Sequence, residues 1–473
     1  MKYRTFSHED QAAFAELSGD YNPIHIDAVA ARRLIFGSPV VHGIHALLWG
    51  LNCCLEDRTD DVELRSIKAR FPKPIRVNES IGISIENKKD GSLSINLLSE
   101  GSVVTAIKVE LSKSSQRNSG HLEAGFPQRQ EPLVLLDDEI EVDSGALELF
   151  LNVESATQMF PHLIRCIPPV QIAVILSTTR LVGSICPGMN SLYSELNLLK
   201  SEPNNNPSMT YKVTKLDRRF GLIHMKINAP ELTGTITAFR RPEPQKQANC
   251  LTLSGETEEN EFAGQRALVI GGSRGLGEVA AKLLAAGGAD VKFTYYQGEE
   301  DAHHIVDDIV SQGGIADCFH FDVLNPRVRP HDVSINKWTP THLYYFATPF
   351  IFSGVKGKFS SRLFETFCDY FVVGFLNTVS LVKDLGTSSI FYPSTVAIDE
   401  MPTNMGEYVA AKLAGESLCA YLGKTDRQIC IYNPRFPRVS TDQTVSIMPV
   451  TNHNPALILM NELRAFRDSS HGN

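Results

Sequence analysis

The chain has 473 residues, too many for a single hydrophobic core, so two to four domains are expected. Its composition, 42% hydrophobic and 21% charged residues, is that of an ordinary globular protein, and the net charge of -9 argues against nucleic acid or an anionic membrane surface as the main partner. The nine cysteines include no Cys-x-x-Cys pair, which excludes the usual disulfide frameworks and zinc sites and favours the cytoplasm. We find no signal peptide and no run near the ~18 apolar residues that span a bilayer.

Two polar stretches divide the chain into three blocks. Residues 113–131 are rich in Ser, Gln, Asn and Gly, and residues 241–261 are rich in Pro, Gln, Glu and Thr. We interpret both stretches as linkers. The expected domains are 1–118, 131–242 and 262–473.

The first block opens with a polar loop that runs into an apolar helix. Residues 18–25 read Ser-Gly-Asp-Tyr-Asn-Pro-Ile-His, and residues 40–43 read Val-Val-His-Gly. The apolar residues that follow at helical spacing, one face of a buried helix, are Ile44, Leu47, Leu48 and Leu51. Alternating segments at 81–85 and 103–109 then predict antiparallel strands, so we expect a sheet wrapped around a helix.

The second block repeats this order without the polar loop. An apolar helical stretch around residues 172–179 precedes strand-like segments at 192–196, 209–213 and 235–239. We interpret this similarity as a weak internal repeat.

Asp20 and His25 form the first candidate site, five residues apart on a loop that contains Pro23. Dehydration of a 3-hydroxyacyl thioester removes a proton from C2 and protonates the leaving hydroxyl. A carboxylate and an imidazole can share this work, each contributing roughly 10²–10⁴-fold. The developing enolate oxygen needs a hydrogen-bond donor, and the backbone N–H of Gly43 at a helix start is the candidate, because the missing Cβ lets the thioester approach. Two other interpretations remain open: an N-capping Asp with a packed His, and an acyl-binding site without catalysis.

This loop, the Val-His-Gly turn and residues 70–74 (Arg-Phe-Pro-Lys-Pro) resemble the MaoC-type (R)-specific enoyl-CoA hydratases of the hotdog fold. The resemblance implies that Asp20 and His25 are the catalytic pair, that Asn22 braces the loop and that Gly43 is the oxyanion donor. The second block resembles the other half of a double hotdog. It has no Asp-x-Asn-Pro-x-His motif, so we expect a structural half that holds the acyl tail.

The third block alternates strands and helices, which predicts a parallel sheet with crossover helices. An apolar strand at 267–270 leads into a glycine-rich turn and a helix, the context in which backbone N–H groups bind a pyrophosphate. Strand 290–296 ends without an acidic residue for a ribose 2′-hydroxyl, and Arg274 lies in the turn, so NADP(H) is predicted rather than NAD. The predicted cofactor contacts of the turn are Gly271, Ser273, Arg274, Gly275, Leu276 and Gly277.

Tyr408 and Lys412 lie one helical turn apart on one face of a predicted helix. A nearby ammonium lowers the pKa of a phenol, which lets Tyr408 exchange a proton with a carbonyl or alkoxide. Ser394, after a strand at 389–392, is placed to hold the same oxygen while a nicotinamide transfers hydride.

From about Phe262 onward the chain resembles the short-chain dehydrogenase/reductase family. The resemblance implies Tyr408 as acid and base, Lys412 as its electrostatic helper and ribose contact, and Ser394 as the ligand of the substrate oxygen. Further cofactor contacts that it implies are Asp322, Val323 and Ala347.

Three departures from the family pattern stand out. The usual Asn-Asn-Ala-Gly reads Tyr-Phe-Ala-Thr at residues 345–348, the helix asparagine is Gly374, and the Pro-Gly after the late strand is Pro434-Arg435. They leave open a relaxed substrate geometry or an inert domain that binds cofactor poorly.

Together these patterns predict an α+β double hotdog followed by an α/β Rossmann-like doubly wound parallel sheet. The predicted function is bifunctional: an NADPH-dependent 3-ketoacyl reductase and an (R)-specific hydratase/dehydratase acting on an acyl-CoA or acyl-carrier-protein thioester. We expect a homo-oligomer without a metal, nucleic acid or membrane partner. Two alternatives remain, a ketoreductase with a non-catalytic acyl-binding hotdog and a hydratase with an inactive reductase-like assembly domain.

Overall fold

The computed structural model describes residues 2–114, 122–202, 208–325, 338–447 and 450–470. The chain forms two compact units, Met1–Glu243 with Ser446–Met448, and Pro244–Val445 with Pro449–Asn473. The first two predicted domains thus lie in one unit, and the three predicted ranges, 1–118, 131–242 and 262–473, remain predictions. In the part of the chain described, no helix is long and apolar enough to cross a membrane.

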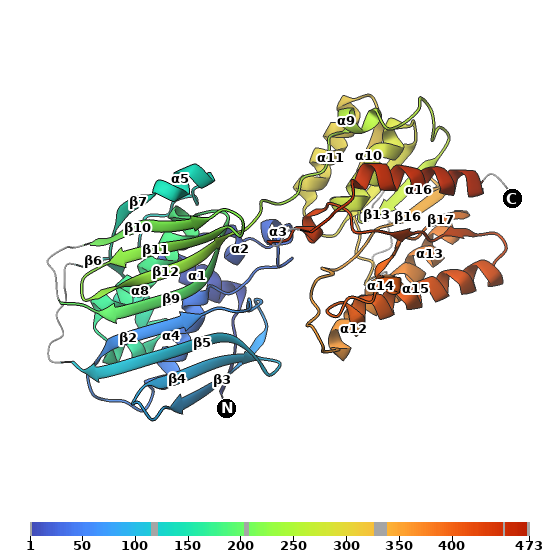
Figure 1. Ribbon diagram of the computed structural model, residues 1–473. Helices are drawn as coiled ribbons and strands as arrows, with labels where there is room; N and C mark the ends of the chain where they lie inside the picture. The colour runs from blue at the N-terminus through green and yellow to red at the C-terminus, as the bar shows by residue number, and fades with distance from the viewer. Residues whose placement is uncertain (1, 115–121, 203–207, 326–337, 448–449, 471–473) are drawn as a thin grey trace. The chain divides into compact units, whose positions relative to one another are not determined.

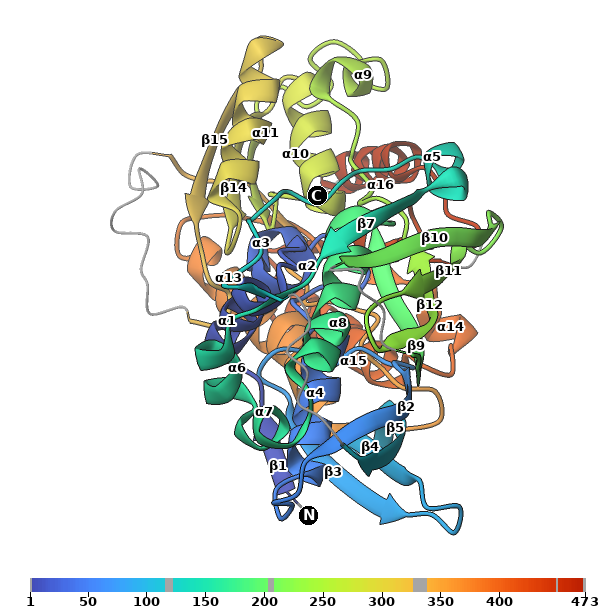
Figure 2. The same cartoon turned by 90° about the vertical axis from the view of Figure 1, so that its left-hand side faces the viewer.

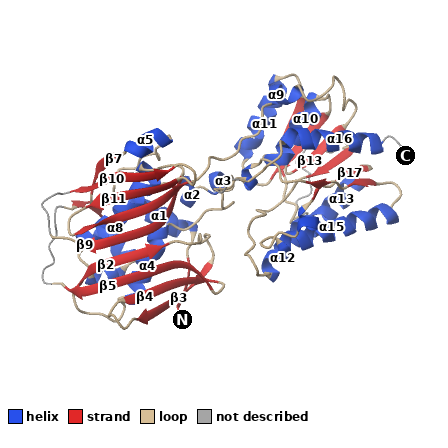
Figure 3. Cartoon of the chain, viewed as in Figure 1, coloured by secondary structure: helices blue, strands red, loops and turns tan. Residues whose placement is uncertain are grey.

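The first unit is built on one antiparallel ten-stranded sheet, in the order β1-β3-β4-β5-β2-β9-β12-β11-β10-β7 (Figures 1 and 3). Its strands are β1 (Lys2–Thr5), β2 (Val62–Arg70), β3 (Ser80–Asn87), β4 (Leu93–Ser99), β5 (Ser102–Lys113), β7 (Ser144–Glu148), β9 (Ser191–Lys200), β10 (Ser208–Asp217), β11 (Leu222–Asn228) and β12 (Leu232–Arg240). All five strand segments predicted in this part lie within these strands. The pair β6 (Glu123–Ala124) and β8 (Phe150–Leu151) stands apart from the sheet.

The ten strands fall into two halves with the same internal order. The order β3-β4-β5-β2 in the first half matches β10-β11-β12-β9 in the second, and β2 pairs with β9 where the halves meet. Each half has one long buried helix, α4 (Gly43–Cys54) and α8 (Pro169–Arg180), which contact each other and the sheet (Figure 2). A single hydrophobic core runs through both halves. The predicted internal repeat therefore has a structural counterpart.

The remaining helices of this unit are short and lie before or between the strands. They are α1 (His8–Ser18), α2 (Pro23–Ile26), α3 (Ala28–Ala31), α5 (Asp137–Val142), α6 (Val153–Met159), α7 (Pro161–Cys166) and the π-helix η1 (Leu181–Ile185), which continues α8.

Helix α4 forms where its apolar spacing predicts it. The four leucine and isoleucine side chains of its predicted face are at most 1% exposed. Because each such side chain contributes roughly 1.5–3 kcal/mol on burial, this face accounts for much of the stability of the first half. The start of α4 is thereby fixed beneath the polar loop.

The second unit has a six-stranded parallel sheet in the order β15-β14-β13-β16-β17-β19. These strands are β13 (Arg266–Ile270), β14 (Asp290–Tyr295), β15 (Ile315–His320), β16 (His342–Tyr345), β17 (Ser389–Phe391) and β19 (Cys430–Tyr432), and a separate pair is formed by β18 (Ser394–Thr395) and β20 (Arg435–Phe436). The strand order reverses between β13 and β16, and in such sheets ligands bind beyond the carboxyl ends of the strands at this point.

Helices cover both faces of this sheet. One core contains side chains of α10, α11 and α16, and another contains side chains of α13 and α15 (Figure 1). The helices are α9 (Cys250–Ser254), α10 (Gly275–Ala286), α11 (Glu299–Ser311), α12 (Ser361–Cys368), the π-helix η3 (Asp369–Gly374), α13 (Phe375–Lys383), α14 (Ala397–Glu400), α15 (Gly406–Thr425), the 3-10 helix η4 (Asp442–Thr444) and α16 (Pro455–Ser470).

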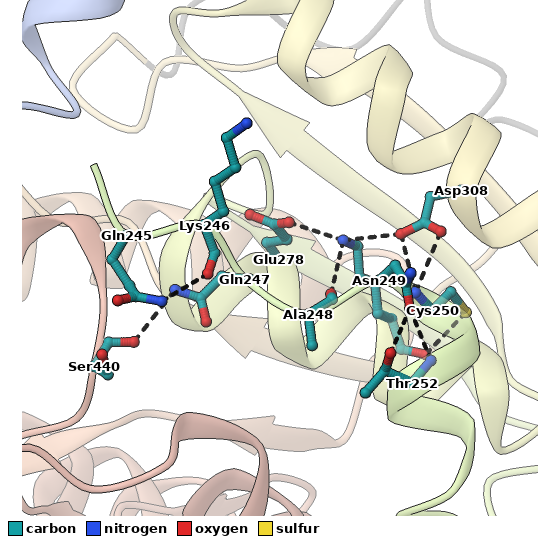
Figure 4. A network of polar contacts seen from close by, with 11 residues as sticks. Gln245, Lys246, Gln247, Ala248, Asn249, Cys250, Thr252, Glu278, Asp308 and Ser440 are labelled. Carbon is teal, nitrogen blue, oxygen red and sulfur yellow. Dashed lines mark hydrogen bonds and ion pairs between the residues drawn. The ribbon is translucent and has the colours of Figure 1, made fainter. Parts of the chain in front are cut away.

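The stretch 241–261 was predicted to be a linker, and this prediction is wrong for its second part. Lys282 on α10 is 4% exposed, and its Nζ donates to Ala248 O at 3.1 Å and pairs with Glu278 at 2.8 Å and Asp308 at 2.9 Å. Asp308 also accepts the backbone N–H of Cys250 at 3.0 Å (Figure 4). A buried ammonium needs such partners, so the segment that supplies one of them is packed onto the second unit.

Candidate active sites

The loop that carries Asp20 joins α1 to α2 and is fixed by its own residues. Gly19 follows the end of α1 with a φ of 78°, a conformation that favours glycine. Asn22 caps α2, accepting the N–H of Ile24 at 3.2 Å, and Pro23 occupies the first helical position, where its missing N–H costs nothing. His25 then lies on α2.

Asn22 ties this loop to the second half of the unit. Its fully buried amide nitrogen lies 3.0 Å from Gly183 O, 3.1 Å from Gly188 O and 3.2 Å from Met189 O, so its two N–H groups are shared among three carbonyls. The contact explains physically how a residue at this position braces the loop.

The Asp20 carboxylate is buried between the two halves. One oxygen, Oδ1, accepts the N–H of Asn22 at 3.2 Å, and the other, Oδ2, accepts the hydroxyl of Thr179 at 2.6 Å. A Cβ on Gly183 would lie 2.0 Å from Oδ1, so glycine is required there. Burial raises the pKa of Asp20, against the opposing effects of His25 and Thr179.

His25 presents an unprotonated nitrogen toward this carboxylate. Its Nδ1 lies 2.7 Å from the carbonyl of Val40 and therefore donates, which leaves Nε2 as the acceptor of the neutral ring. Burial lowers the pKa of His25, although Asp20 acts in the opposite direction, so the ring is neutral near pH 7. One side-chain atom each of Asp20, His25 and His42 lie within 4.8 Å of one another. The structure thus brings Asp20 and His25 together.

His42 lies closer to this pair than its sequence position indicates. The reason is that the loop that carries Asp20 folds over the start of α4. Its ring stacks on that of His25 with centroids 3.8 Å apart, its Nε2 donates to Asp20 O at 3.0 Å, and its Nδ1 lies 3.0 Å from Gln11 Oε1. Both nitrogens of His42 thus lie next to hydrogen-bonding partners, and the expectation of no metal stays a prediction.

Gly43 is the first residue of α4, where backbone N–H groups have no partner inside the helix. A Cβ at this position would lie 3.0 Å from the ring of Phe71. We predicted glycine at position 43 because it leaves room for a thioester. The close packing of the Phe71 ring is a second reason for glycine there.

The glycine-rich turn of the second unit is shaped by close backbone approaches. Gly271 has a φ of 78°, and its Cβ would lie 2.9 Å from Ala347 N at the end of β16. A Cβ on Gly277 would lie 2.2 Å from Gly271 O. At Gly275, whose φ is 59°, a Cβ would make ordinary van der Waals contacts, the nearest with Asp442 Oδ1 at 3.7 Å. A glycine turn ahead of a helix N-terminus is an arrangement that favours phosphate charge, and here the carboxylate of Asp442 lies beside it. Ser273 is buried in this turn, and Leu276 follows on α10.

Arg274 is not free to recognise a phosphate. Its guanidinium pairs with the buried carboxylate of Asp442 at 2.7 Å, so its charge is compensated within the unit. The sequence argument for a 2′-phosphate assumed a free guanidinium and loses this support. Asp322, in turn, accepts the N–H of Leu324 at 2.9 Å in the loop after β15, and its neighbour Val323 is buried.

Tyr408 and Lys412 share one face of α15, and both are buried. Lys412 Nζ donates to Pro393 O at 2.8 Å and lies 4.1 Å from the centroid of the Phe371 ring. Burial raises the pKa of Tyr408 to about 12 and lowers that of Lys412 to about 7. The structure does not show the predicted lowering of the Tyr408 pKa by Lys412, because burial raises this pKa and the opposing effect comes from the hydroxyl of Thr395.

Ser394 turns away from Tyr408. Its hydroxyl donates to Glu416 Oε1 at 2.5 Å, and Arg435 holds the same carboxylate through contacts at 2.8 and 2.7 Å. The hydroxyl that interacts with Tyr408 belongs to Thr395. Successive strand residues point to opposite faces, so one of the two hydroxyls must face away, and the sequence does not indicate which. Thr395 is the residue that sequence reasoning missed.

Two of the three family departures compensate each other. The hydroxyl of Tyr345 donates to Tyr370 O at 2.7 Å, a carbonyl of the π-helix η3. A Cβ on Gly374 would lie 3.0 Å from that hydroxyl, so glycine makes room for the tyrosine. The third departure, Arg435, pairs with Glu416 and with Asp399 at 2.6 Å.

Comparison with protein families gives a match in the first unit. Residues 1–106, which contain the Asp20 loop and α4, match the model of the MaoC like domain. Residues 1–106 are a MaoC-like domain. Its helix and sheet are the first half of the ten-stranded unit.

Similar proteins match parts of the chain. Peroxisomal multifunctional enzyme type 2 from Drosophila melanogaster is 33% identical over 79 residues, 16% of this chain and 13% of that protein. The mitochondrial 3-hydroxyacyl-[acyl-carrier-protein] dehydratase from Arabidopsis thaliana is 35% identical over 78 residues, 16% of this chain and 39% of that protein. The matches therefore span well under half the length of these relatives.

Similar solved structures include a short chain dehydrogenase from Burkholderia cenocepacia J2315 in complex with NADP, with 26% identity and a TM-score of 0.34, covering 39% of this chain and 78% of that one. A dehydrogenase/reductase from Sinorhizobium meliloti 1021 has 22% identity and a TM-score of 0.37, covering 43% of this chain and 90% of that one.

Proposed function

We propose that the chain is a bifunctional enzyme of 3-hydroxyacyl-thioester metabolism. The ten-stranded unit is a double hotdog whose first half, the MaoC-like domain, is an (R)-specific enoyl-CoA hydratase/3-hydroxyacyl dehydratase. The second unit is a Rossmann-like short-chain reductase of 3-ketoacyl thioesters. The observation that carries the hydratase proposal is the proximity of buried Asp20 and half-buried His25, with a carboxylate oxygen and a ring nitrogen within 4.8 Å.

In the hydratase the pair divides two proton transfers. In hydration, neutral His25 accepts a proton through Nε2 from the water that adds to C3, the protonated Asp20 carboxyl gives its proton to C2, and the proton on His25 then returns to Asp20. In dehydration the Asp20 carboxylate takes the C2 proton and protonated His25 gives its proton to the leaving hydroxyl. The thioester oxygen gains negative charge during both directions. The N–H of Gly43 at the start of α4 is the donor for it, because its dipole is fixed before the reaction begins.

Crotonyl-CoA hydration by the purified protein tests this half. We expect Asp20→Asn and His25→Ala each to lower kcat by at least about 10²-fold, while Asp57→Asn, an exposed carboxylate in the same domain, leaves it unchanged. Undiminished hydration in both active-site variants refutes the assignment.

In the reductase the glycine turn and the start of α10 hold the cofactor phosphates, with Ala347, Asp322 and Val323 as the further predicted contacts. A bound nicotinamide supplies the hydride for a 3-keto group. Tyr408 exchanges a proton with the substrate oxygen, and Lys412 contacts the ribose and stabilises the phenolate. The hydroxyl that orients the substrate oxygen is that of Thr395 rather than the predicted Ser394, because Thr395 interacts with Tyr408.

Acetoacetyl-CoA reduction tests this half. Tyr408→Phe is expected to abolish NADPH-dependent reduction. Full reductase activity in this variant would refute the role of Tyr408 and leave the alternative in which the second unit is an assembly domain. The matched pair Thr395→Val and Ser394→Ala separates the two hydroxyls: a larger loss of kcat in Ser394→Ala contradicts the assignment to Thr395.

The cofactor is proposed to be NADP(H), now supported by the absence of an acidic residue at the end of β14 rather than by Arg274. A larger kcat/KM with NADH than with NADPH overturns it. The acyl carrier is coenzyme A or a carrier protein, in line with the named substrate of the plant relative. The homo-oligomer and the cytoplasmic location stay predictions, and the names of animal relatives point to the peroxisome instead.

A further inference from the structure

We propose that Thr179, from the second half of the ten-stranded unit, positions the Asp20 carboxylate, so that the hydratase site is built from both halves. This inference rests on the proposed hydratase function. It gives the second half, which lacks the catalytic loop, a direct part in the reaction.

The contact itself is short and enclosed. Thr179 Oγ1 donates to Asp20 Oδ2 at 2.6 Å, and the two residues are 3% and 1% exposed. A hydrogen bond to an ionised carboxylate is roughly twice as strong as one between neutral groups, and a low local dielectric strengthens it further. Thr179 therefore fixes one carboxylate oxygen, while the N–H of Asn22 fixes the other.

The helix that carries Thr179, together with its π-helical continuation, contacts the catalytic loop at several residues. Thr179 lies in the last turn of α8, and the π-helix η1 continues it with Gly183 and Ser184. Gly183 O accepts from the amide of Asn22 at 3.0 Å, and the hydroxyl of Ser184 donates to Gly19 O at 3.2 Å. Short π-helical segments are frequent at functional sites, and this one lets the chain approach the carboxylate more closely than a side chain would allow.

Loss of the hydroxyl has a specific consequence. With valine at position 179, Oδ2 has no donor from α8, so the carboxylate is free to rotate and the pKa of Asp20 rises further. Thr179 does not reach the substrate in this account. The substitution should therefore affect the chemical step more than substrate binding.

The experiment compares Thr179→Val with Thr178→Val, the next residue on the same helix. Thr178 is also buried, but its hydroxyl donates to Ile175 O at 2.6 Å within the helix. We expect Thr179→Val to lower kcat for crotonyl-CoA hydration by about 10–100-fold with KM changed less than about threefold, and to move the pH–rate limb that depends on Asp20 to higher pH. Thr179→Ser restores the hydroxyl and should recover most of kcat, and Thr178→Val should resemble the wild type.

Equal losses of kcat in Thr179→Val and Thr178→Val, or no recovery in Thr179→Ser, overturn the inference. So does an unchanged pH profile in Thr179→Val. If Asp20→Asn is inactive while Thr179→Val keeps full activity, the inference alone fails. If the wild type itself does not hydrate the thioester, the proposed function fails and the inference falls with it.

Discussion

Replacing Gly183 by alanine tests how tightly the Asp20 carboxylate is held. The added Cβ would lie 2.0 Å from Oδ1, 2.4 Å from Cγ and 2.5 Å from Oδ2. Non-bonded carbon and oxygen atoms do not approach closer than about 3 Å, so the carboxylate or the helix must move by at least about 1 Å. A displacement of about 1 Å at a catalytic group costs on the order of 10²-fold, or about 2.7 kcal/mol in the activation free energy.

The assay is crotonyl-CoA hydration, with acetoacetyl-CoA reduction measured on the same sample. Gly50→Ala is the matched control, because Gly50 is also helical and its Cβ would meet apolar side-chain atoms at longer distances, Ile107 Cδ1 at 3.1 Å, Ile95 Cγ2 at 3.4 Å and Leu97 Cδ2 at 3.8 Å. We expect hydration to fall about 10²-fold in Gly183→Ala alone, with reduction unchanged in both variants. A kcat within twofold of the wild type in Gly183→Ala would show that the position of the carboxylate does not limit the reaction.

Three further predictions concern stability. Asn22→Ala removes a helix cap and leaves buried carbonyls without a donor, so urea denaturation should show a loss of about 2–4 kcal/mol in the first unit; a loss below about 1 kcal/mol contradicts the bracing role. Burial lowers the pKa of His25, His42 and His45 below 6.5 in the folded protein. Below pH 6.5 the unfolded chain therefore binds more protons than the folded protein. The free energy of unfolding should then fall by up to about 1.4 kcal/mol per pH unit for each histidine. The Tm at pH 5.5 should therefore lie below that at pH 7.5, and equal values refute the assignment of neutral rings. Lys282→Met leaves Glu278 and Asp308 without the Lys282 cation and should lower the free energy of unfolding of the second unit by about 3–5 kcal/mol. Lys246→Met, at an exposed position, should change this free energy little. Similar urea midpoints for the two variants refute a stabilising role of the buried Lys282 ion pairs.

Local sequence patterns were sufficient to predict several helices and strands and the loop that contains Asp20 and His25. Apolar spacing located α4, period-two alternation located β3 and β5, and the run from Ser18 to His25 contained its own C-cap, N-cap and proline. These features act over a few residues, so a single sequence reveals them. The proximity of Asp20 and His25 follows from the same local geometry.

Contacts between segments far apart in the sequence could not be predicted from such local patterns. Thr179 in α8 and Gly183 in η1 are ordinary residues of an apolar segment, and they meet the Asp20 loop because the two halves pack together, with α8 against α1 and α4. The same limit applies to Arg274, whose partner Asp442 begins the 3-10 helix η4, far along the chain. Charge compensation and side-chain facing depend on the tertiary structure, so the cofactor argument and the choice of Ser394 were the weakest predictions.

The packing of residues 245–254 determines where the second unit can be divided from the first. Cys250 and Leu253 are each 2% exposed and belong to the same core as α10. A recombinant fragment beginning at residue 262 would open a hydrophobic gap on α10 and strip Lys282 of its contact with Ala248. A fragment beginning at Pro244 keeps this packing and this contact, and is the one to express when the second unit is studied alone.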